Sequence, residues 1–115
     1  MKLPNIEEAV VRRSKIVEYL LSEVHPTGHD KSEFFGRLGF QASAWEDLAR
    51  ALVHHAKQND VESTQDTEYG KRYVVEGVIA VPRGGSAAIR AVWFVDRGAV
   101  IPRLITAYPM PENQP

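Results

Sequence analysis

The sequence predicts an α+β domain in which three N-terminal helices pack on a four-stranded antiparallel β-meander. Apolar residues recur at helical spacing up to about residue 59, whereas strand-forming residues dominate from residue 61 onward. The later strand-like runs are joined by short turns containing glycine or proline, which connect antiparallel neighbours. Because helices precede strands, we expect the helices on one face of the sheet and an open opposite face.

The first predicted helix covers residues 14–24. Its apolar residues Ile16, Leu20 and Val24 recur every four positions and would form one buried side. Pro26 ends this helix, because the residue before a proline avoids the α-helical region.

The second predicted helix begins at about Asp30, which forms a capping pair with Glu33 three residues later. Gly39 follows as a C-terminal cap, since glycine tolerates the left-handed conformation found there. The buried side of this helix would consist of Phe34, Phe35 and Leu38.

The third predicted helix has the clearest pattern and ends near Asn59. Residues 43–46 read Ser-Ala-Trp-Glu, which is a capping box at its start. One face repeats apolar side chains at helical spacing, namely Trp45, Leu48, Ala49, Leu52, Val53 and Ala56.

Four strands are expected after this helix, at residues 61–69, 72–81, 87–96 and 102–109. The first is polar throughout, which is typical of an edge strand. In the third strand, alternation puts Trp93 on the same face as other apolar residues, so we expect it in the core.

The bulk properties limit the classes of function. The chain has 115 residues, which predicts one domain at residues 1–110 with a flexible C-terminal tail at 111–115. It contains no cysteine, so thiolate chemistry and cysteine metal sites are excluded. The net charge is −1 and no apolar run approaches the ~18 residues of a membrane span, so we expect no membrane partner.

Chemistry-bearing residues concentrate in residues 25–35, where His25, His29 and Lys31 lie close together around a turn and a helix start. Histidine exchanges protons near neutral pH, and a helix N-terminus attracts anions. A phosphate held here would meet an acid–base group and a cation, as phosphodiester cleavage without a metal requires. The alternative is structural: His25 would cap the first helix and His29 would be a solvated turn residue.

The last strand is the second candidate segment. Strict alternation places Leu104, Thr106 and Tyr108 on one face and Arg103 on the other. Thr106 and Tyr108 would hydrogen-bond a phosphate or stack on a base, although both are also ordinary strand residues.

The adjacent pair His54 and His55 is expected at the surface or its boundary, because neighbouring helix positions point in different directions and do not chelate a metal together. No EF-hand or HExxH spacing is present, so neither a metal nor another cofactor is expected.

Two segments together resemble an uncharacterised family of small bacterial domains. The family carries HP-x-G-x-x-K-x-x-FF, EYG and R-L-[VI]-T-A-Y-P motifs, which correspond here to residues 25–35, 68–70 and 103–109. The chain is also distantly similar to the barnase–EndoU–colicin–RelE group of ribonuclease toxins, in its helices-then-meander order and its final strand. That resemblance implies a site on the sheet that includes histidine, basic residues and a threonine or tyrosine.

Two functional hypotheses follow. In the first, the domain is a metal-independent endoribonuclease-like toxin or effector, with His25 or His29 as acid or base and Lys31, Thr106 and Tyr108 at the phosphate. The arginine that binds RNA would be Arg103 or Arg72. The ribonuclease toxins carry a basic residue on their sheet, and both Arg72 and Arg90 are candidates for the matching position. Its partner would be a cognate immunity or antitoxin protein, and it would act in the cytoplasm, also after release from a larger exported toxin.

In the second hypothesis, the domain is a non-catalytic interaction module, such as a toxin–antitoxin or phage-associated adaptor that binds through its open sheet face. The two hypotheses differ in whether His25, His29, Thr106 and Tyr108 line one cleft, as the enzyme requires, or whether Thr106 and Tyr108 are buried far from the histidines.

Overall fold

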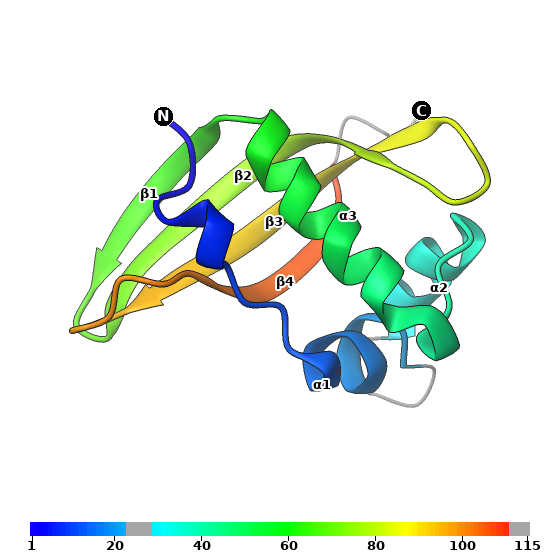
Figure 1. The fold of residues 1–115 in the computed structure, drawn as a ribbon, viewed down its shortest axis with the longest axis horizontal. Helices are drawn as coiled ribbons and strands as arrows, with labels where there is room; N and C mark the ends of the chain where they lie inside the picture. Colours follow the sequence, from blue (N-terminus) through cyan, green and yellow to red (C-terminus); the bar gives the residue numbers. More distant parts are fainter. Residues whose placement is uncertain (23–28, 111–115) are drawn as a thin grey trace.

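The computed structural model describes residues 1–22 and 29–110 of the chain. Its helical elements are η1 (Ile6–Glu8), α1 (Arg13–Lys15), η2 (Ile16–Leu20), α2 (His29–Arg37), η3 (Ala42–Ala44) and α3 (Trp45–Gln58). Its strands are β1 (Val61–Thr67), β2 (Gly70–Ala80), β3 (Ser86–Asp96) and β4 (Arg103–Pro109). They form one antiparallel sheet in the order β1-β2-β3-β4, with α3 crossing one side of it (Figure 1). The predicted α+β class with a four-stranded meander is therefore confirmed.

The first helix is shorter and less regular than predicted. α1 continues directly into η2, a π-helix in which the Leu21 N–H donates to the Ile16 carbonyl over 2.7 Å. Ile16 and Leu20 are buried as expected, whereas the predicted Val24 lies outside the described residues.

α3 lies in the middle of the chain, not at its N-terminal end. The predicted capping box at its start is wrong. Ser43 lies inside the 3-10 turn η3, and the N-cap position is occupied by Ala44, which provides no side-chain bond. The Ser43 hydroxyl is directed to the Gln41 side chain at 3.5 Å, so the capping geometry is lost. The predicted end is confirmed, because Asn59 is the C-cap.

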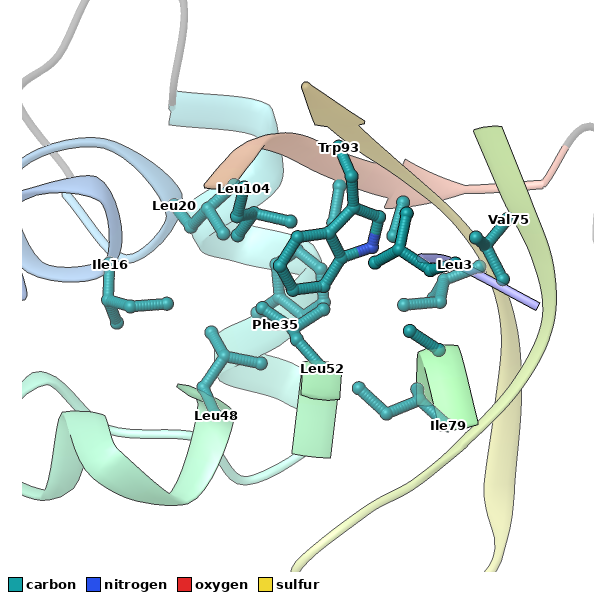
Figure 2. Close-up of a cluster of buried hydrophobic side chains, with 14 of the residues drawn as sticks. Leu3, Ile16, Leu20, Phe35, Leu48, Leu52, Val75, Ile79, Trp93 and Leu104 are labelled. Carbon is teal, nitrogen blue, oxygen red and sulfur yellow. The ribbon is translucent and has the colours of Figure 1, made fainter. Parts of the chain in front are cut away.

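The core lies between the sheet and the helices. Trp93 is fully buried at its centre, among Leu3, Phe35, Leu52 and Leu104 (Figure 2). The prediction of Trp93 as a core residue is confirmed. Gly39 has φ +102° and follows α2 as the predicted C-terminal cap, and the next residue, Phe40, packs into the same core.

The N-terminal segment closes the structure in a way that the sequence pattern did not indicate. The Val61 N–H donates to the Met1 carbonyl at the β1 edge, over 2.7 Å. Val10 then forms a parallel bridge at the β4 edge, where its N–H donates to Pro102 and its carbonyl accepts from Leu104. These bonds pair backbone groups that an edge strand would otherwise present to other chains.

α3 docks closely on β2 at Gly77. The ring atom Nε2 of His55 lies 3.1 Å from the Gly77 carbonyl oxygen, and Asn59 caps α3 by donating to the His55 carbonyl. His55 is 1% exposed, so the prediction of a surface or boundary position is wrong for this residue, while His54 is exposed as expected. The hydrogen bond to Gly77 satisfies Nε2, whereas Nδ1 is buried without a hydrogen-bond partner in the described part of the chain.

Burial lowers the pKa of His55, and its hydrogen bond to the Gly77 carbonyl opposes this only in part. The unfolded chain therefore binds a proton more readily than the folded one, so stability is lost as the pH falls below about 6.5. We expect His55→Gln to weaken this acid sensitivity in urea titrations between about pH 5 and 7. His54→Gln is the matched control and should retain it; an unchanged pH slope in His55→Gln would contradict the assignment.

The close approach at Gly77 predicts a steric penalty. A Cβ added at Gly77 would lie 2.1 Å from Asn59 Oδ1, so Gly77→Ala must displace the Asn59 cap. We expect a loss of about 1–3 kcal/mol in the free energy of unfolding. Gly36→Ala is the control, because Gly36 has no neighbouring atom within 4 Å of such a Cβ and lies in α2. Equal denaturation midpoints for the two variants would show that α3 does not depend on this contact.

Candidate functional site

A β-bulge in β4 decides which residues reach the open face. Val92 pairs with Thr106 and Trp93 pairs with Leu104, so Ile105 is an extra residue between them. Leu104 and Ala107 therefore both face the core, at 3% and 0% exposure. The predicted grouping of Leu104 with Thr106 and Tyr108 is wrong, because strict alternation does not hold across a bulge.

The same bulge brings the predicted residues of the last strand together. Arg103 pairs with Phe94, Thr106 with Val92 and Tyr108 with Arg90, and cross-strand partners share a face. Arg103, Thr106 and Tyr108 thus share the face of the sheet opposite Trp93, contrary to the predicted separation of Arg103.

Lys31 of the first candidate segment and Thr106 of the second both contact Tyr19 in η2, a residue that the sequence did not single out. Its hydroxyl lies 3.3 Å from Thr106 Oγ1, and Lys31 of α2 also hydrogen-bonds to it. The Nζ atoms of Lys15 and Lys31 lie 5.0 and 5.3 Å from the centre of its ring. We refer to Lys15, Tyr19, Lys31 and Thr106 as the Tyr19 cluster. It joins the helix start and the final strand at one edge of the sheet.

The electrostatics of the Tyr19 cluster favour a negative charge on its phenol. Partial burial raises the pKa of Tyr19, but the hydrogen bonds from Thr106 and Lys31 and the charges of Lys31 and Lys15 outweigh it. The net result is a pKa below the usual value for tyrosine. The cluster therefore favours the phenolate of Tyr19 over what an isolated tyrosine would show.

The structure does not describe the side chains of the two predicted catalytic histidines. His25 lies outside the described residues. His29 is the first residue of α2, two positions before Lys31, and its side chain is also outside the described part. Their catalytic roles remain predictions.

On the open face, two arginines are held by carboxylates of the chain itself. Arg90 Nε donates to Glu76 over 2.5 Å, and its guanidinium lies 5.7 Å from the ring centre of Tyr108. Arg103 donates twice to Asp96, over 2.8 and 3.0 Å. The hydrogen bond from Arg103 lowers the pKa of Asp96, which keeps this pair charged.

Arg72 lies between these pairs. It borders a hollow of about 310 Å³ that Tyr108 and Arg90 also line, and a second of about 440 Å³ beside Arg103. Of the three sheet arginines, Arg72 alone lacks a carboxylate partner among residues 1–22 and 29–110. Arg72 is therefore the sheet arginine open to another partner, although Glu62 and Glu76 line the first hollow and Asp96 lines the second.

A further groove, of about 600 Å³, lies along α3 and the N-terminal segment. Trp45, Ala49 and Val53 form its apolar part, and His54 is on its lining. Within the described residues, no three His, Asp or Glu side chains converge as a metal site would require. In that same part of the chain, no helix is long and apolar enough to cross a membrane.

Sequence reasoning missed Tyr19 and the carboxylate partners of the arginines. Tyr19 follows Lys15 by four positions, which predicts neighbouring side chains on one helix turn. Nothing in the local sequence predicts its contact with Thr106, which lies 87 residues away. The pairing of Arg90 with Glu76 follows only from the register of β2 with β3.

Comparison with known proteins shows where this fold occurs. The search of curated proteins finds no match. Among solved structures, the chain is similar to one from the "Contact-dependent growth inhibition toxin - immunity protein complex from Klebsiella pneumoniae 342". The TM-score is 0.70 at 18% sequence identity, covering 90% of this chain and 95% of the other, which establishes a common fold.

The sequence model of one family matches residues 2–111, which is nearly the whole chain. The chain belongs to this family, described as a domain of unknown function, DUF6883.

Proposed function

We propose that this domain is a metal-independent endoribonuclease-like toxin or effector, with its site at the β4 edge of the sheet. The observation that carries the proposal is the Tyr19 cluster. It brings Lys31, from the segment with both histidines, into contact through Tyr19 with Thr106 of the final strand. Cations, a phenol and a hydroxyl in one place are suited to a phosphodiester, whose transition state carries additional negative charge.

The residues divide into two roles. His25 or His29 deprotonates the 2′-hydroxyl of the RNA, since imidazole is the side chain that titrates near neutral pH. Lys31 and Thr106 hold the scissile phosphate. On the adjoining open face, Arg72 binds a neighbouring phosphate and Tyr108 stacks on a base.

Arg103 has a different place in this proposal from Arg72. Its guanidinium already makes two hydrogen bonds with Asp96 and lies 5.5 Å from the ring centre of Phe94. In this proposal Arg103 therefore lines the hollow beside Arg72 as a neutral pair with Asp96, and it does not bind a phosphate directly.

The fold supports a role in a toxin–immunity pair, as either of its two proteins, and we propose the toxin. The similar solved chain comes from a complex named for a growth-inhibition toxin and its immunity protein. A domain of this kind needs a cognate immunity or antitoxin protein in the cell that makes it, and its substrate RNA lies in the bacterial cytoplasm.

A second function is favoured by a specific observation. The Arg90–Glu76 and Arg103–Asp96 pairs are satisfied within the chain, as on a surface that recognises another protein by its charge pattern. In that case the domain is a non-catalytic module that binds its partner through the open sheet face, and it leaves RNA intact.

Cleavage is tested by inducing the domain in bacteria and examining total RNA on a gel. We expect wild type to slow growth and degrade RNA, because the cluster and a histidine act together. Cleavage should fall by about 100-fold or more in Thr106→Ala. The same loss is expected in one of the two variants His25→Ala and His29→Ala, namely the one that removes the base. The control is His54→Ala, on the exposed side of α3. Normal growth with intact RNA for wild type would favour the non-catalytic module.

RNA binding by Arg72 is tested with a non-cleavable 2′-deoxy oligonucleotide and fluorescence anisotropy at several salt concentrations. We expect Arg72→Gln to weaken binding and to reduce the slope of log K against log salt by about 0.7, the value for one lost contact with a single strand. Arg83→Gln is the control, because Arg83 lies in the exposed turn between β2 and β3. If the two variants showed the same slope of log K against log salt, Arg72 would not contact the nucleic acid.

A further inference from the structure

Tyr19 has the contacts of a proton donor at the proposed site. Its hydroxyl lies 3.3 Å from Thr106 Oγ1 and is hydrogen-bonded by Lys31, whose ammonium group can only donate. The phenol is half-buried, and the ammonium groups of Lys15 and Lys31 lie 5.0 and 5.3 Å from the centre of its ring. These neighbours stabilise the phenolate that remains after the proton has left.

The position of Tyr19 is fixed by the core. It lies in η2 next to Leu20, which is fully buried, as is Ile16 at the start of the same π-helix. π-helical turns are rare and are often found at functional sites. A phenol on such a turn is held at a defined distance from β4, as a proton donor must be.

We propose that Tyr19 is the general acid of this site and protonates the 5′-oxygen that leaves during RNA cleavage. This inference rests on the proposed ribonuclease function. It extends that function by assigning the acid to a residue outside the histidine-containing segment, so that a single histidine is sufficient as the base.

The step balances as follows. The 2′-oxygen forms a bond to phosphorus while the histidine takes its proton. The bond between phosphorus and the 5′-oxygen breaks, and the proton of Tyr19 moves to that oxygen. The products are a 2′,3′-cyclic phosphate and a free 5′-hydroxyl, and the histidinium and the phenolate return to their starting states by proton exchange with water.

The acid is tested with two substrates whose leaving groups differ in their need for a proton. On RNA, whose 5′-oxygen is a poor leaving group, we expect Tyr19→Phe to lower kcat by about 100-fold or more while KM stays nearly constant. On a uridine phosphodiester with a nitrophenolate leaving group, which departs without protonation, Tyr19→Phe should match wild type within a few-fold. Tyr73→Phe is the control, since Tyr73 is buried on the helix-facing side of β2.

Two outcomes overturn the assignment. If Tyr19→Phe cleaved RNA as fast as wild type, Tyr19 would not be the general acid. Equal losses on both substrates would give Tyr19 a positioning role instead. A wild-type protein that cleaves neither substrate would overturn the ribonuclease function itself, which separates the two failures.

A second measurement does not need activity. Phenolate absorbance followed during a pH titration should show one of the four tyrosines ionising before the others, and Tyr19→Phe should abolish that early step. If the early ionisation step is still present in Tyr19→Phe, it does not belong to Tyr19, and the electrostatic basis of the proposal is wrong.

Discussion

The bulge at Ile105 is the constraint on which the site depends. It lets Leu104 and Ala107 both enter the core, so β4 is anchored under Trp93 on each side of the extra residue. The same displacement directs Arg103, Thr106 and Tyr108 to the opposite face. At the start of β4 the outer edge is occupied by Val10, whose backbone bonds to Pro102 and Leu104 prevent further strand addition at that point. One irregular residue thus determines both the packing of the last strand and the chemistry that it presents.

Much of the fold could be predicted because its causes are local. Helical periodicity identified Leu48, Leu52 and Ala56 as buried, and the short turns imply a meander. The errors arose where a distant contact decides the local structure. Ser43 has the right residue type for a cap but lies in a 3-10 turn, and His55 is drawn into the core by the Gly77 carbonyl. A bulge changes the face of a strand without changing its composition, so alternation alone assigned Arg103 to the wrong face.

The candidate site was predictable only in part, for the same reason. Lys31 and Thr106 were selected for their chemistry, and the fold does connect them. The connecting residue, Tyr19, belongs to a helix whose apolar spacing predicts which side is buried but not which residue contacts β4. The choice among the arginines likewise depended on register, since Glu76 and Asp96 are adjacent to Arg90 and Arg103 only after the strands have paired.

The charge distribution explains how a chain of net charge −1 can present a site for an anion. On the open face, Glu76 pairs with Arg90 and Asp96 with Arg103, while Arg72 shares its hollow with Glu62. At the β4 edge, Lys15 and Lys31 are directed at the Tyr19 ring. The proposed function would therefore depend on cations at particular positions, not on the charge of the whole chain. Such local cations would guide a phosphate chain along one path, whereas a uniformly basic surface would bind it without a defined register.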